Sequence, residues 1–226
     1  MKRFFAFTLA ETLIVMGIIG IVSALTLPNL NSSTGEKEKV AKVKKIYQNL
    51  TDAIGRAQAV YGPIDEWIQT SDSTMELQST RIGERITEFI KVGKTCGIAV
   101  NKGCFTTNVI LDYDNSVAYD DDNDNNSGVY KIITADGTSI GFMYGVSPYC
   151  SIYVDLDGPN KGKNRAGEDR FVFYANKNGV FPWDLESDRS GNFESYDVDV
   201  WAIENDNMDY LKCADELNWE TKRTCK

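Results

Sequence analysis

Residues 7–28 read FTLAETLIVMGIIGIVSALTLP, and Glu11 is the only charged residue among them. A helix rises 1.5 Å per residue, so about 20 apolar residues cover the ~30 Å hydrocarbon core of a bilayer. Lys2 and Arg3 precede the stretch, and basic residues tend to stay on the cytoplasmic side. Five lysines between residues 37 and 45 weaken that bias, so the orientation also rests on the cysteines. The stretch predicts one membrane-spanning helix, with the rest of the chain outside the cytoplasm.

The same stretch also allows a secretory signal peptide, in which Val22-Ser23-Ala24 would supply the small residues before a cleavage site. An ordinary signal peptide has a shorter apolar region, of about 7–15 residues, and no acidic residue near its start. A charge at the centre of a bilayer costs about 2.5–3.5 kcal/mol on insertion scales, and such residues are usually functional. Glu11 lies nearer the cytoplasmic end, where the cost is lower, yet its presence still indicates a function.

A short basic leader ends at the small residue Ala6 and is followed by Phe7-Thr8-Leu9, Glu11 and an apolar stretch that continues to Pro28. These residues resemble the N-terminus of type IV pilins and of type II secretion pseudopilins. The resemblance implies that a prepilin peptidase cuts between Ala6 and Phe7 and methylates the new Phe7 amine. It also implies that Glu11 neutralises this amine on a neighbouring subunit during assembly. Most members of the family have glycine where this chain has Ala6.

Gly20 and Pro28 stand where family members carry helix-weakening residues. The run NLNSSTG at residues 29–35 is also rich in helix breakers, so we expect the helix to be interrupted there. The chain then divides into a leader, a transmembrane and polymerisation helix, an amphipathic continuation of that helix and a globular head, at residues 1–6, 7–28, 29–62 and 63–226.

Apolar residues recur at helical spacing from Val40 to Val60, with lysines and glutamines between them. This pattern predicts an amphipathic helix that ends near Gly62-Pro63. Its apolar side needs a partner, which is either a sheet in the head or a lipid surface. Residues 73–92 predict a second, shorter helix with four apolar side chains on one side, Ile82, Ile86, Phe89 and Ile90.

The later part of the chain has the composition of strands and hairpin turns. Asp136-Gly137 and Asn178-Gly179 are hairpin dipeptides. The predicted strands around them are residues 129–134, 138–144, 149–156 and 170–175. We therefore expect an α+β fold in which a long N-terminal helix packs on an antiparallel sheet.

The composition argues against two broad classes of function. The net charge of −9 and the pI of about 4.7 disfavour a nucleic-acid partner. The chain contains no histidine, which removes the commonest general base and the commonest metal ligand. We expect a protein that is not an enzyme and that binds no nucleic acid.

Five cysteines are present, and none forms a CxxC pair that would indicate a zinc site. Disulfides suit them if the head lies outside the cytoplasm. Cys96 and Cys104 enclose a short glycine-containing loop, whereas Cys213 and Cys225 could close a second loop that resembles the disulfide-bounded region of many pilins. Cys150 would be left over. The sequence leaves the connectivity open, and all five could instead be reduced and buried.

The segment from Asp155 to Asn160 is the best candidate for a ligand site. Asp155, Asp157 and Asn160 surround a glycine turn, and Asp169 could approach from the start of the next strand. Closely spaced Asp and Asn oxygens suit Ca²⁺. The segment also resembles loops of pseudopilin-like bacterial proteins, some of whose relatives bind calcium in the head. The alternative is an Asx-turn loop with solvated carboxylates, and no complete EF-hand is present because Ala166 stands where its closing glutamate would fall.

A second acidic run, residues 119–126, places Asp120, Asp122 and Asp124 at alternating positions, as an EF-hand loop begins. Asn125 replaces the turn glycine, and Lys131 stands where a bidentate glutamate would be needed. A solvated loop is therefore the favoured interpretation of this run.

The resemblance implies a structural subunit of a type IV pilus, a type II secretion system or a related filament. Its partners would be other pilin-like subunits, a prepilin peptidase and, before assembly, the bacterial inner membrane. The head would lie outside the cytoplasm, and later in a periplasmic or cell-surface filament. The alternative is a minor tip subunit whose acidic head binds a ligand or a secreted substrate, and a membrane-anchored enzyme is a third reading.

Overall fold

The computed structural model divides into two compact units, Met1–Glu38 and Lys39–Lys226. It describes residues 9–67, 74–100, 103–106, 110–117, 128–145, 150–159, 161–182 and 189–225, except for the side chains of residues 23–34 and 196. The acidic run at Asp120, Asp122 and Asp124 lies outside the described residues.

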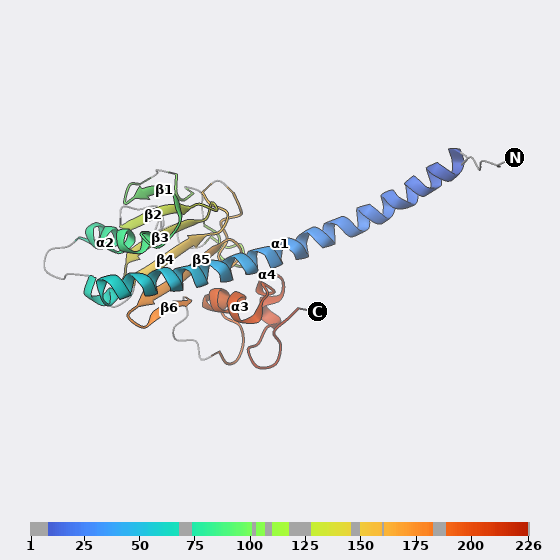
Figure 1. Ribbon diagram of the computed structural model, residues 1–226. Coiled ribbons are helices and arrows are strands. Elements are labelled where there is room, and N and C mark those ends of the chain that lie inside the picture. Colours follow the sequence, from blue (N-terminus) through green and yellow to red (C-terminus); the bar gives the residue numbers. More distant parts are fainter. Residues whose placement is uncertain are drawn as a thin grey trace. The chain divides into compact units, whose positions relative to one another are not determined.

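The first helix, α1, spans Leu9–Tyr61 (Figure 1). The interruption expected at residues 29–35 was wrong, because the backbone of α1 is helical through this run and through Gly20 and Pro28. One proline costs a helix about 3 kcal/mol, but a second helix would have to be nucleated again, which is also unfavourable. The helix ends where predicted, since Gly62 adopts a left-handed φ of 81° and its N–H donates to the Gln58 carbonyl (3.0 Å).

A six-stranded antiparallel sheet follows, with its strands in simple sequence order. The strands are β1 Val92–Gly97, β2 Val129–Thr134, β3 Ser139–Tyr144, β4 Cys150–Asp155, β5 Arg170–Asn176 and β6 Gly179–Pro182. Strands β2 to β5 confirm the predicted strands to within a residue or two. Both predicted hairpin dipeptides connect neighbouring strands, so the expectation of an α+β fold with an antiparallel sheet is confirmed.

The predicted helix at residues 73–92 is shorter in the structure. Helix α2 spans Met75–Thr87, and the Thr74 hydroxyl caps it by accepting a hydrogen bond from the Leu77 N–H (3.3 Å). Val92 starts strand β1 instead of ending the helix. Strand β1 gave no signal in the sequence because it is a largely exposed edge strand with two register shifts, so its side chains do not alternate.

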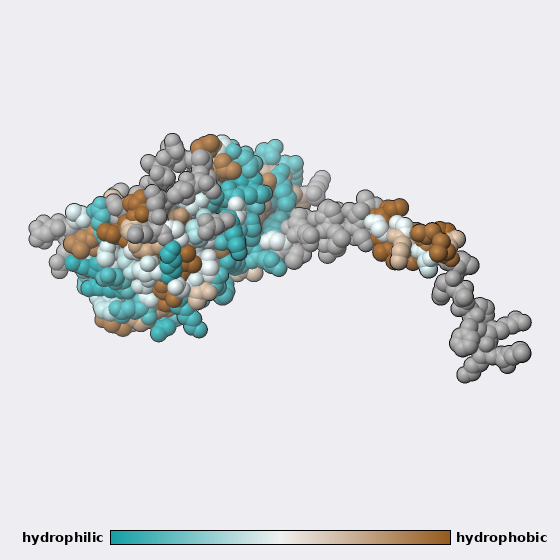
Figure 2. Space-filling view, turned by 90° about the horizontal axis from the view of Figure 1, so that it is seen from above, coloured by the Kyte–Doolittle hydropathy of each residue, from teal (hydrophilic) through white to brown (hydrophobic). Residues whose placement is uncertain are grey.

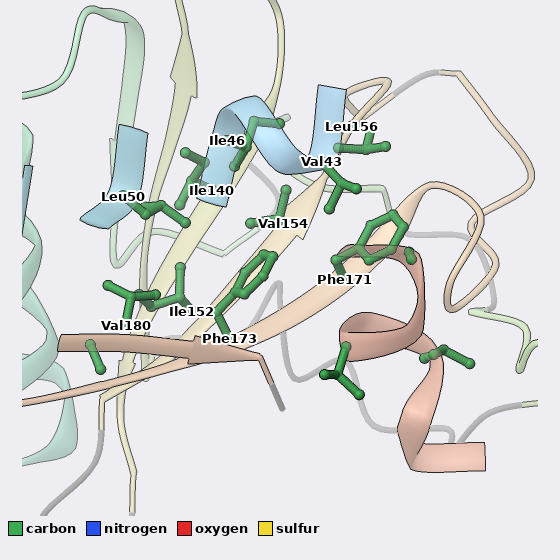
Figure 3. Close-up of a cluster of buried hydrophobic side chains, with 14 of the residues drawn as sticks. Val43, Ile46, Leu50, Ile140, Ile152, Val154, Leu156, Phe171, Phe173 and Val180 are labelled. Atoms are coloured by element: carbon green, nitrogen blue, oxygen red, sulfur yellow. The ribbon is translucent and has the colours of Figure 1, made fainter. Parts of the chain in front are cut away.

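The C-terminal half of α1 and helix α2 cover one face of the sheet (Figure 1). Val43, Ile46 and Leu50 of α1 point at side chains from β3, β4 and β5 (Figure 3). All three are at most 4 % exposed, and Ile152 and Phe173 beneath them are fully buried. The apolar side of α1 thus has the sheet as its partner, and the alternative of a lipid surface is not needed for this part of the helix.

The last part of the chain forms two short helices, α3 Val198–Asn205 and α4 Tyr210–Cys213, and the 3₁₀ turns η2 Ser195–Asp197 and η3 Ala214–Glu216. A further 3₁₀ turn, η1 Ile64–Trp67, follows α1. The C-terminal elements enclose four buried aromatic side chains, Phe193, Trp201, Tyr210 and Trp219. None of these helices was predicted, because each is too short to show a helical period.

Asp199, in the first turn of α3, is only 4 % exposed and accepts a hydrogen bond from the Val172 N–H of β5 (3.2 Å). Burial raises its pKa to about 8, and the Val172 N–H opposes that rise. An unfolded aspartate has a pKa of about 3.9. The folded protein therefore holds this proton more tightly, and the resulting stability is lost as the pH rises from about 4 through about 8.

We predict that Asp199→Asn flattens this pH dependence. The wild-type melting temperature should fall between pH 5 and pH 9, and the fall should be smaller in the variant because asparagine does not titrate. Circular dichroism melts across this range measure the difference. Asp206→Asn, at an exposed aspartate, serves as the control and should keep the wild-type profile. Identical profiles for Asp199→Asn and the wild type would show that Asp199 does not carry the effect.

Candidate functional site

The first part of α1 has an apolar surface on all sides. Nine large apolar side chains between Leu9 and Val22 are each more than half exposed, from 53 % at Val22 to 80 % at Leu9. They include four consecutive residues, 13–16, which point in four directions because a helix turns about 100° per residue. Figure 2 shows hydrophobic residues in brown, with paler residues between them, on the side of this helix that faces the viewer. A helix that is apolar all round is normally buried, so this surface is suited to lipid or to other protein.

Glu11 is the acidic residue in the first turn of this helix, and Thr12 donates its hydroxyl proton to the Leu9 carbonyl (2.9 Å). The first turn is the positive end of the helix dipole, where a carboxylate is favoured. Ala6 and Phe7, the predicted processing residues, lie outside the described residues. Among the helices as far as they are described, none is both long and apolar enough to cross a membrane.

The Asp155 carboxylate, at the end of β4, is fully buried and engaged at both oxygens. Its Oδ1 accepts hydrogen bonds from the N–H groups of Asp157 (3.1 Å) and Gly158 (3.0 Å). Its Oδ2 lies 3.1 Å from Nη1 of Arg170, the residue opposite it on β5. Burial and the neighbouring Asp169 carboxylate raise the pKa of Asp155 to about 7, and the two N–H donors oppose that rise. Above this pH, the carboxylate forms a buried ion pair with Arg170.

Asp169 is also fully buried, and the loop before it wraps around its carboxylate. Oδ2 accepts hydrogen bonds from the N–H groups of Lys163 (2.6 Å) and Asn164 (3.0 Å), and Oδ1 accepts one from Arg165 (2.6 Å). Gly162 is required in this loop, because its φ is 77° and a Cβ there would lie 2.0 Å from Asp169 Oδ2. The carboxylate therefore organises the loop through backbone donors.

These contacts bear on the predicted calcium ligands Asp155, Asp157, Asn160 and Asp169. In the part of the chain that is described, no group of three or more acidic, cysteine or histidine side chains could hold a metal ion. Asn160 lies outside the described residues. Asp155 Oδ1 accepts from the Asp157 N–H, which is the Asx turn of the alternative. The solvated carboxylates of that alternative were wrong, because Asp155 and Asp169 are fully buried and direct their oxygens at backbone N–H groups and at Arg170.

We therefore expect calcium to leave the stability of the head unchanged. Saturation of a calcium site at 100 times its dissociation constant would stabilise the folded state by about 2.7 kcal/mol. Melting curves of the full-length protein in detergent, with millimolar calcium and with chelator, should superimpose. A rise in melting temperature that Asp157→Asn abolishes would instead establish a cation site in this loop.

Two disulfides join Cys96 to Cys104 and Cys213 to Cys225, and Cys150 is a free, buried thiol. Burial raises the pKa of Cys150 to about 12, so the thiol stays protonated and unreactive. The structure thus has the connectivity that the sequence had left open.

Arg170 was missed as a partner of Asp155 in the sequence, where it was read only as the start of a strand. The signal was present, because the first residue of β5 faces the last residue of β4 in an antiparallel hairpin. Glu168 is a second residue whose ion pairs the sequence analysis missed. It meets Lys39 of α1 (3.0 Å), Lys163 (3.3 Å) and Arg165 (2.8 Å), which ties the loop to the helix.

Comparison of the chain with protein-family models, with curated proteins and with solved structures finds no match.

Proposed function

We propose that the chain is a pilin or pseudopilin, a structural subunit that assembles into a type IV pilus, type II secretion or related filament through α1. The observation that carries the proposal is the exposed apolar surface of Leu9–Val22, with Glu11 as its acidic residue. Such a surface needs a bilayer before assembly and a protein core afterwards, as a filament subunit requires.

The resemblance of residues 6–28 to prepilins supports the proposal independently of that surface. Cleavage between Ala6 and Phe7 would leave an amine four residues before Glu11. An ammonium group and a carboxylate that both enter an apolar environment stabilise each other, whereas either alone is heavily penalised. The proposal includes a single-pass location in the bacterial inner membrane, with the head outside the cytoplasm. Two disulfides in the head support that compartment.

The test is the mass of the mature chain. We expect a chain that starts at Phe7 and carries one methyl group, because the peptidase cleaves after Ala6 and methylates the new amine. Intact-mass analysis of the membrane fraction, with and without a prepilin peptidase in the host, measures it. Ala6→Gly is the matched control and should be processed at least as completely. A mature start after Ala24 would identify an ordinary signal peptide and overturn the proposal.

A further inference from the structure

A cleft of about 410 Å³ opens on the helical face of the head. Its walls are α1, the turn between α2 and β1, and the turn between β2 and β3. Ile46 and Leu50 of α1 and Ile140 of β3 form its apolar floor. Ligand pockets of proteins have volumes of about 300–1,000 Å³, so the cleft is large enough to receive side chains of a partner.

The walls of the cleft are held in place by specific contacts. Lys45 of α1 pairs with Asp136 of the β2–β3 turn (3.4 Å), and the Ala135 N–H donates to the Lys91 carbonyl (2.8 Å). The ammonium group of Lys91 has no hydrogen bond or ion pair with any other described residue. Asp52 of α1 also lines the cleft, and its carboxylate pairs with Arg56 (3.6 Å). The cleft therefore combines an apolar floor with the Lys91 ammonium group at its rim, which suits an apolar side chain that has an acidic neighbour.

The turn at residues 111–117 of the same chain carries such a pair. Val117 is 64 % exposed, more than any other large apolar side chain described in Lys39–Lys226. Asp112 and Asp114 precede it, and Asp114 accepts a hydrogen bond from the Ser116 N–H (2.8 Å). The Ser116 hydroxyl, and after it the Ser116 N–H, lower the pKa of Asp114, so its carboxylate is ionised at neutral pH.

This turn is held by contacts with another part of the head. The Leu111 N–H donates to the Asn164 carbonyl (2.8 Å), the Arg165 guanidinium donates to Asn115 Oδ1 (2.7 Å), and Tyr113 packs edge-on against Phe193 (5.7 Å between ring centroids). None of the segments that hold the turn lines the cleft.

We propose that the head of one copy of this chain inserts Val117 into the cleft of the next copy, with Asp114 facing Lys91. The contact joins two different surfaces, so it is heterologous, and its repetition produces an open chain of subunits. The inference rests on the proposed function and deepens it by naming a contact between heads. One side chain in one cleft buries far less than the ~1,000 Å² of a stable interface, so the contact needs the high local concentration that α1 provides in a filament.

Cysteine crosslinking of the full-length protein in filaments tests the contact. A chain with Asn49→Cys at the cleft and Val117→Cys on the turn is treated with a short bismaleimide. We expect a ladder of crosslinked oligomers, whereas a mixture of the two single-cysteine chains should stop at dimers. The buried Cys150 should not react, so wild-type filaments provide the blank. Asn49→Cys with Val60→Cys is the matched control. Val60 is equally exposed (63 %), but its neighbour one helical turn away is the basic residue Arg56, whereas Val117 has the acidic neighbour Asp114.

Charge variants test the same contact without relying on the introduced thiols. Lys91→Glu in the double-cysteine chain should reduce the ladder at least tenfold, and Asp114→Lys in addition should restore it. A ladder as strong in the Val60 control, or dimers formed by Val117→Cys chains alone, would overturn the docking. The docking would also be overturned if the wild type forms filaments and the double-cysteine chain melts normally but gives no ladder. That outcome would leave the proposed function intact. Absence of wild-type filaments would overturn the proposed function itself.

Discussion

Replacing Glu11 with alanine should leave processing at Phe7 intact and reduce incorporation of the chain into filaments at least tenfold. Under the proposed function, the Phe7 ammonium group enters an apolar filament core, where the Glu11 carboxylate of a neighbouring subunit compensates it. Removal of one partner of a buried ion pair costs about 3–5 kcal/mol, and each 1.4 kcal/mol changes an equilibrium about tenfold. The measurement is the amount of the variant in sheared filaments relative to the amount in membranes.

Two further variants separate charge from shape at this position. Glu11→Gln keeps the size of the side chain and should fail like alanine, because it cannot neutralise an ammonium group. Thr12→Ala is the control, since it changes the neighbouring residue of the same turn and removes only a hydrogen bond to the Leu9 carbonyl. Normal filaments from both Glu11 variants would contradict the pairing. They would leave the apolar surface as the only driving force for assembly.

Replacing Asp155 with alanine should destabilise the head by about 3–5 kcal/mol at pH 8. The side chain of Asp155 is fully buried and that of Arg170 is 7 % exposed, so the variant removes the carboxylate that pairs with the guanidinium in the protein interior. It also removes the acceptor of two backbone N–H groups, at Asp157 and Gly158. Denaturant unfolding of the full-length protein in detergent, followed by tryptophan fluorescence, measures the loss.

The matched control is the exposed pair of Arg189 and Glu204. Its Nε–Oε1 distance is 2.8 Å, but both side chains are more than 40 % exposed. Glu204→Ala should cost at most about 1 kcal/mol, because water screens the pair. Replacement of both buried partners, as Asp155→Leu with Arg170→Met, should recover part of the stability lost in Asp155→Ala. Equal small losses for Asp155→Ala and Glu204→Ala would contradict the assignment of a buried ion pair.

Local patterns predicted the elements whose residues repeat regularly or carry a specific turn. The helical period from Val40 to Val60 predicted the amphipathic part of α1 and its end at Gly62. The strand composition and the Asp136-Gly137 turn predicted β2 and β3. These features are encoded within a few consecutive residues, so the sequence by itself determined them.

The edge strand β1 and the short helices α3 and α4 were decided by the tertiary structure, whereas the continuity of α1 through Pro28 follows from the length of the helix. Each depends on pairing or packing with residues distant in sequence, or on the cooperativity of a long helix, and none of these appears in a short window.

The loop after β4 shows, for a candidate site, the same division between what the local sequence determined and what the tertiary structure decided. The sequence placed Asp155 and Asp157 beside a glycine turn, which is compatible with calcium and with an Asx turn alike. Only the folded chain brings Arg170 opposite Asp155 and turns three backbone N–H groups toward Asp169. The partners of a carboxylate are set by strand register and loop conformation, and the burial that those create determines whether its charge is neutralised by protein or left to a cation.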